Sequence, residues 1–125
     1  MIGFVETFID LRVPKSGDIR YTLSKLTYFP KVAKGIIEVD VHLATDLGSI
    51  PQALQSLFPK DGKAMFAYIL HDDLYKRGLY SRSTTDDVLE EAMKTLGVTW
   101  WRRKAIREGL RVGGWVAWNK HRKKD

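Results

Sequence analysis

Residues 67–93 read AYILHDDLYKRGLYSRSTTDDVLEEAM, and their spacing predicts two helices joined by a short turn. In the first helix, His71 and Tyr75 share one face, and Asp72 lies in the neighbouring row. In the second helix, Asp86 lies at the N-terminal edge of the apolar stripe. The short connection favours antiparallel packing, so we expect His71 and Asp72 to face Asp86 across the helix pair.

The remaining polar residues of these two helices are expected to be less buried. Asp73 is better placed for the protein surface than Asp72. The second helix is expected to begin at Thr84, and its solvent side takes Asp87, Glu90, Glu91 and Lys94.

The His and Asp residues suit acid–base chemistry. A histidine with a carboxylate behind it can act as a general base, and a second carboxylate beside it can hold a cation. The chain has no cysteine, so a metal ion would need oxygen or imidazole ligands, and a thiolate nucleophile is excluded.

The composition favours one domain, residues 1–125, with one core, because the chain has 125 residues of which 44% are hydrophobic. Charges interrupt every apolar run before the length that a membrane span needs. Glu6 and Asp10 lie where a signal peptide would be uncharged, so we expect no secretion by a signal peptide.

The pattern predicts an α+β fold. Residues 1–45 are expected to be mainly β, with three or four short antiparallel strands within Ile2–Val13, Ile19–Tyr28 and Gly35–Ala44. Residues 46–120 are expected to form about four helices, and 121–125 a basic tail. The predicted helices are Gln52–Phe58, Lys63–Arg77, Thr84–Leu96 and Thr99–Lys120, the last bent or broken at Gly113-Gly114.

The net charge of +6 is concentrated in residues 98–125, which hold nine Lys or Arg residues against two acids. The favoured interpretation is that Trp101, Trp115 and Trp118 belong to the core beneath a solvated basic face. Alternatively, the segment lies on an anionic membrane surface, or it binds a polyanion through phosphate contacts. No motif predicts sequence-specific nucleic-acid binding. The residues expected to form this polyanion or partner surface are Arg102, Arg103, Lys104, Arg107 and Arg111.

The turn TDLGSIP, residues 45–51, carries a second group of candidates. Asp46 and Ser49 suit the turn's own hydrogen bonds and the capping of the next helix, and Pro51 suits its first turn. Ser49 is disfavoured as a nucleophile because no Gly-x-Ser-x-Gly pattern surrounds it.

Several blocks in order resemble the phage and prophage proteins grouped as domain of unknown function 1353. The blocks are TDLGSIP, HDDLY, a turn with Arg82, DDVLEEAM followed by LGV, and GGWVAW, covering about Leu26 to Trp118. The resemblance implies a bacteriophage or prophage origin but no established activity. It also implies a location in the host cytoplasm or the phage virion, and that the family's signature positions here are Asp46, Ser49, Pro51, His71, Asp72, Tyr75 and Asp86. Gln52 departs from the family, which often has Arg there.

The His-Asp helix with a Tyr three residues after the Asp is also similar, over some 25 residues, to the core of phospholipase A-two-type enzymes. That resemblance implies that His71 activates water, Asp86 orients it with help from Tyr75, and Asp72 holds calcium or another divalent cation, with Asp46 as a further ligand. The glycine-rich calcium loop of these enzymes is not evident, unless Asp46-Leu47-Gly48-Ser49 substitutes for it. The disulfides of the secreted enzymes are missing, as they are from the similar parvovirus capsid phospholipase.

Two functional hypotheses follow. The first is a small metal-assisted phage hydrolase that cleaves a lipid or another cell-envelope bond. The second is a non-enzymatic virion or assembly component, in which the His/Asp cluster is structural and the basic helix binds another phage protein, an anionic envelope surface or a polyanion. A lone His on an apolar helix face is more often structural than catalytic.

Overall fold

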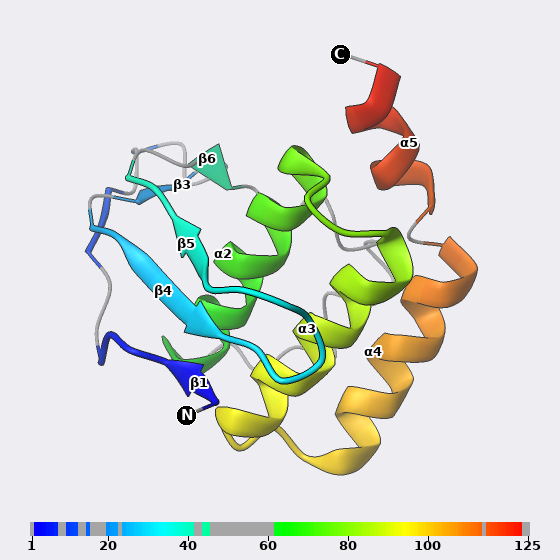
Figure 1. Cartoon of the computed structure of the whole chain (residues 1–125), viewed down its shortest axis with the longest axis horizontal. Coiled ribbons are helices and arrows are strands. Elements are labelled where there is room, and N and C mark those ends of the chain that lie inside the picture. Colours follow the sequence, from blue (N-terminus) through cyan, green and yellow to red (C-terminus); the bar gives the residue numbers. More distant parts are fainter. Residues whose placement is uncertain are drawn as a thin grey trace.

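The computed structural model describes residues 2–7, 10–12, 15, 20–22, 24–41, 44–45, 62–113 and 115–123. Within them, six short strands precede four helices, which confirms the α+β class (Figure 1). The strands are β1 (Gly3–Phe4), β2 (Leu11–Arg12), β3 (Arg20–Thr22), β4 (Leu26–Phe29), β5 (Ile37–Val39) and β6 (Ala44–Thr45). The helices are α2 (Gly62–Arg77), α3 (Arg82–Thr95), α4 (Trp100–Gly113) and α5 (Trp115–Lys123).

The strands form two antiparallel sheets of three strands each, in the orders β1-β4-β5 and β2-β3-β6. Each of the three segments predicted to be β contains or adjoins two of these strands, so the described residues form six strands where three or four were predicted. In the first sheet, Leu26 pairs with Val39 and Tyr28 pairs with Ile37. These four side chains are buried, while Glu38 between them is exposed. The alternation of apolar and polar residues therefore turns one face of this sheet toward the helices.

The core lies between this sheet face and the helices α2, α3 and α4 (Figure 1). Its largest contributions from the helices are fully buried aliphatic side chains on successive turns, a pattern that removes much apolar surface from water. They include Ile69, Leu70, Leu74, Leu89, Met93, Ile106 and Leu110.

The helices α2 and α3 form a hairpin whose connection is only Gly78 to Ser81. Gly78 has a φ of 63°, and its amide donates to the Leu74 carbonyl at 3.0 Å, so it ends α2 in the left-handed conformation. The N-cap of α3 is Ser81, whose Oγ accepts from the Thr84 amide at 3.1 Å. The helix begins two residues before the predicted Thr84, because Ser81 already supplies the capping oxygen.

The C-terminal helix is broken after Gly113, as the Gly-Gly pair predicted, and α5 extends to Lys123. The expectation that Trp101 and Trp115 belong to the core was wrong, since these side chains are 55% and 52% exposed. Trp118 is partly buried. On α4 the core positions belong to Ile106 and Leu110 instead.

The predicted helix Gln52–Phe58 and the candidates Asp46, Ser49 and Pro51 lie outside the described residues.

Candidate functional site

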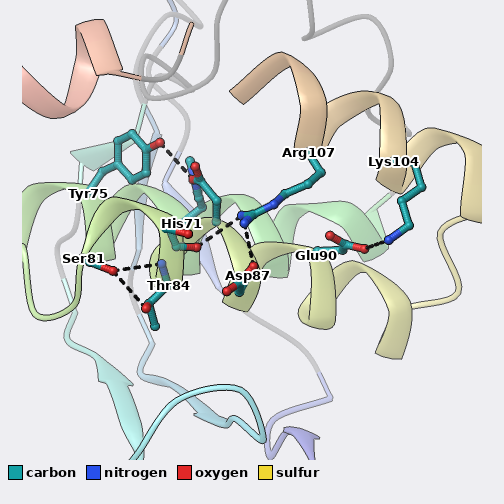
Figure 2. A network of polar contacts seen from close by, with 10 residues as sticks. His71, Tyr75, Ser81, Thr84, Asp87, Glu90, Lys104 and Arg107 are labelled. Atoms are coloured by element: carbon teal, nitrogen blue, oxygen red, sulfur yellow. Dashed lines mark hydrogen bonds and ion pairs between the residues drawn. The ribbon is translucent and has the colours of Figure 1, made fainter. Parts of the chain in front are cut away.

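His71, Tyr75 and Asp86 come together in the α2–α3 hairpin. His71 Nε2 lies 3.1 Å from Asp86 Oδ1, and the Tyr75 hydroxyl donates to the same oxygen at 2.9 Å (Figure 2). All three residues are buried, with no more than 3% of their surface exposed. The His71 and Tyr75 rings also pack against each other, with centroids 4.2 Å apart. The helical spacing in the sequence predicted this convergence.

The hydrogen bond to Asp86 assigns different roles to the two His71 nitrogens. A carboxylate is an acceptor, so in a neutral ring Nε2 carries the proton and Nδ1 is the basic nitrogen. Asp86 therefore fixes both the orientation and the tautomer of the imidazole.

The environment of Tyr75 keeps its hydroxyl protonated. Burial raises the pKa of Tyr75 far above its ordinary value, and the Asp86 carboxylate raises it further. The Arg82 guanidinium acts in the opposite direction on this pKa, which places a positive charge beside the cluster. Arg82 also donates to the Leu110 carbonyl at 3.0 Å, so it connects the start of α3 to α4.

Asp72 is buried, as the helical phase predicted. The pKa of Tyr68 is raised first by burial and then by the negative charge of Asp72. The preference for Asp73 as a surface residue was wrong, because Asp73 is only 6% exposed and forms an ion pair with Arg77. Burial raises the pKa of Asp73 and the Arg77 charge lowers it, with burial the larger effect.

No three Asp, Glu, His or Cys side chains form a group that could hold a metal ion within the described ranges. Asp72 is the described member of the predicted cation site, and Asp46 lies in the part of the chain that is not described.

Glu91 is a structural residue that the sequence analysis misplaced on the solvent side. Its carboxylate accepts from the Tyr28 hydroxyl at 2.7 Å, from the Lys31 amide at 3.0 Å and from the Val32 amide at 3.2 Å. These contacts attach α3 to the loop after β4. No sequence pattern links residue 91 to partners about 60 positions earlier, and only the folded chain brings them together.

Most of the basic residues on α4 have partners within the protein. Arg107 pairs with Asp87 at 2.7 Å and Lys104 pairs with Glu90 at 2.6 Å, and Figure 2 shows both reaching from α4 to α3. Arg103 donates to the Val98 carbonyl at 2.8 Å. The other two candidates stay on their own helix: Arg111 pairs with Glu108, and Arg102 lies over the Trp101 ring.

The helix α5 reaches the cluster through two side chains. Arg122 donates to the Tyr75 carbonyl at 2.8 Å and to the Lys76 carbonyl at 2.9 Å, and so caps the end of α2. Its guanidinium lies over the Trp118 ring at 4.5 Å, and the Trp118 ring meets Tyr75 edge-on at 5.3 Å. In the sequence, a basic residue near the C-terminus is all that could have indicated this cap.

Fold and site together define an α+β protein in which a helical hairpin, packed against an antiparallel sheet, holds a buried His-Asp-Tyr cluster. Residues 21–107 match a family described as protein of unknown function (DUF1353), and the chain belongs to this family. Neither a curated protein nor a solved structure matches the chain.

Proposed function

We propose that the protein is a small hydrolase in which His71 is the general base. The observation that supports this most directly is the shared Asp86 oxygen, which receives both His71 Nε2 and the Tyr75 hydroxyl. An imidazole fixed in this way has one defined orientation and tautomer, which is what a proton-abstracting group needs.

In the proposed reaction, His71 Nδ1 takes a proton from water as the oxygen attacks the substrate carbonyl. Asp86 stabilises the imidazolium that forms, in the same way as the carboxylate of other His-Asp pairs. Tyr75 holds the Asp86 carboxylate in place and remains protonated, because burial and the neighbouring negative charge raise its pKa. The proton then passes from Nδ1 to the leaving group.

The proposed substrate is an ester of a lipid or another bond of the bacterial cell envelope, and the proposed source is a bacteriophage or prophage. The support for the substrate class is the spacing of His71, Asp72 and Tyr75 on one helix, with Asp86 of the next helix bonded to His71 and Tyr75, which resembles phospholipase A-two-type enzymes.

The decisive experiment measures hydrolysis of a panel of phospholipids and peptidoglycan fragments by wild type and by His71→Gln. Loss of the general base should lower kcat by about a hundredfold or more, while circular dichroism shows an unchanged fold. Asp87→Asn is the matched control, because it removes the carboxylate next to Asp86 that pairs with Arg107 on the outer side of α3. Equal activity of wild type and His71→Gln on every hydrolysed substrate would contradict the proposal.

The proposed cation, calcium or another divalent ion, is tested separately. A thermal melt with EDTA, calcium, magnesium and zinc in turn should show a higher midpoint with the ion that binds the folded protein. Asp72→Asn should remove that rise. A midpoint that no ion changes would restrict the proposal to a reaction without a bound cation.

The complete burial of His71 and Tyr75 favours a second candidate, a non-enzymatic phage structural protein in which the cluster locks α2 to α3. In that case no substrate is hydrolysed, and both His71→Ala and Asp86→Ala lower the free energy of unfolding by about 1–3 kcal/mol, because each leaves a buried polar partner unsatisfied.

A further inference from the structure

Five large apolar side chains of α4 and α5 are exposed to solvent. Their exposed fractions lie between 52% and 70%, and they form one group at the start of α4 and another around the break between the two helices. A concentration of such residues on two consecutive helices is unusual for a surface without a partner. The residues are Trp100, Trp101, Val112, Trp115 and Val116.

Helical geometry places the two groups on the same side of α4. Trp101 and Val112 are eleven residues apart, about three turns, so their side chains point in the same direction. The buried Ile106 and Leu110 lie on the opposite side. The exposed side of α4 thus begins and ends with a large apolar residue, and Trp115 and Val116, three and four positions after Val112, are exposed at the start of α5.

The positive charge of this region favours an anionic partner. Residues 98–125 carry an excess of seven positive charges. Asp87 and Glu90 of α3 pair with Arg107 and Lys104 of this segment, and counting these two acids lowers the excess to five. The exposed pair of Arg111 and Glu108 contributes little stability and can be exchanged for a lipid phosphate. Two copies of such a face would repel each other, whereas an anionic surface would attract it.

We propose that this α4–α5 face, defined by Trp101, Val112, Trp115 and Val116, docks on the surface of a bilayer that contains anionic phospholipids. Tryptophan rings favour the headgroup level of a membrane, valine side chains enter the acyl boundary, and Lys and Arg meet the phosphates. Nucleic acid would engage the cations alone and leave the exposed valines in water. None of the described helices is long and apolar enough to cross a bilayer, which suits docking in the plane of the surface.

This docking would act close to the candidate site. The same helix that exposes Trp115 and Val116 contacts Tyr75 through Trp118 and the end of α2 through Arg122. The inference does not depend on the proposed hydrolysis, because membrane binding is measured with lipids that lack an ester bond.

The test is co-sedimentation of the protein with vesicles of ether-linked phosphatidylcholine, with and without ether-linked phosphatidylglycerol. The wild type should bind only the anionic vesicles, with a blue shift of tryptophan fluorescence, and binding should weaken as salt is added. The variant Trp115→Ser/Val116→Ser should bind at least about tenfold more weakly, because it removes apolar contacts without removing charge.

The matched control is Ile36→Ser/Leu79→Ser, which changes two apolar side chains that are equally exposed, at 58% and 53%, on another part of the surface. It should bind as wild type does. Absence of binding to anionic vesicles at low salt would overturn the proposal. So would binding that the Trp115→Ser/Val116→Ser variant retains in full, equal binding to a DNA duplex, or a lipid-free dimer that this variant dissociates.

Discussion

At the scale of single residues, the polar interior depends on carboxylates that each accept several donors. The Asp86 carboxylate accepts hydrogen bonds from His71 and Tyr75, and the Glu91 carboxylate accepts them from a tyrosine hydroxyl and two backbone amides. Hydrogen bonds to a charged acceptor are stronger than those between neutral groups. These two side chains therefore fix α3 on both of its sides, toward α2 and toward the first sheet.

Glu91→Gln should lower the free energy of unfolding by about 1–3 kcal/mol, because the charged acceptor is lost and an amide NH₂ faces backbone donors. Urea unfolding measures this difference. Glu90→Gln is the matched control on the same helix, since Glu90 makes a partly exposed pair with Lys104 that contributes at most about 1 kcal/mol. Equal effects of the two substitutions would show that the Glu91 contacts do not hold the loop.

Sequence patterns located the His71 and Asp86 pair because both partners belong to one hairpin, where helical phase and a short turn decide the geometry. The same reasoning misplaced Glu91 and Asp73. Their partners are backbone amides of a distant loop in the first case and a nearby Arg77 in the second. From helical phase alone, a charged residue next to other charged residues is predicted to lie in solvent. A partner inside the protein can nevertheless make its burial favourable.

At the scale of elements, α5 is fastened to the hairpin mainly by Arg122, which bonds two carbonyls at the end of α2. Arg122→Ala should leave these carbonyls without their donor and release α5. Hydrogen exchange should become faster in α5 and in the last turn of α2, while α3 keeps its protection. Lys120→Ala, an exposed change on the same helix, should leave exchange unchanged. Unchanged protection of α5 in Arg122→Ala would refute this attachment.

Gly78 links the hairpin turn to the same contact. It has a positive φ, and an added Cβ would lie 2.7 Å from Arg122 Nη1, so Gly78→Ala should strain the backbone and displace the guanidinium. Gly97→Ala, with a φ of 84° and no atom within 4 Å of the added Cβ, should show the backbone strain alone, about 1–2 kcal/mol.

A double-mutant cycle measured by urea unfolding separates these two effects. The additional loss in Gly78→Ala should disappear in the Arg122→Ala background. If the loss persists there, the Arg122 contact is not its cause.

The elements themselves were largely predictable, since the apolar period changes from two to about 3.6 between β5 and α2, and Gly78 and Gly97 follow the ends of α2 and α3. The exposure of Trp101 and Trp115 could not be predicted from the sequence. A tryptophan at helical spacing indicates a face, but which face the core covers depends on how α4 packs on α3, and in the folded chain Ile106 and Leu110 take the core positions.

At the scale of the whole molecule, the core is unusual in combining buried tyrosines with acids. Burial raises the pKa of Tyr28, Tyr68 and Tyr75, and the adjacent Glu91, Asp72 and Asp86, respectively, raise it further. In the unfolded chain these hydroxyls ionise near the ordinary value of 10.0. Above that pH the folded state therefore holds more protons than the unfolded state, so stability is complete below it and is lost as the pH rises.

Each of the three tyrosines should contribute a decrease of about 1.4 kcal/mol in the free energy of unfolding per pH unit above that value. Urea unfolding from about pH 8 to about pH 11.5 measures the slope. Tyr75→Phe should remove one of the three contributions. The slope of the wild type minus the slope of Tyr75→Phe gives the Tyr75 contribution alone, because lysine ionisation affects both proteins equally. The chain has five tyrosines, so phenolate absorbance from more than two of them near the ordinary pKa, while the protein is still folded, would contradict this account. It would mean that at least one of the three buried hydroxyls loses its proton as an exposed tyrosine does.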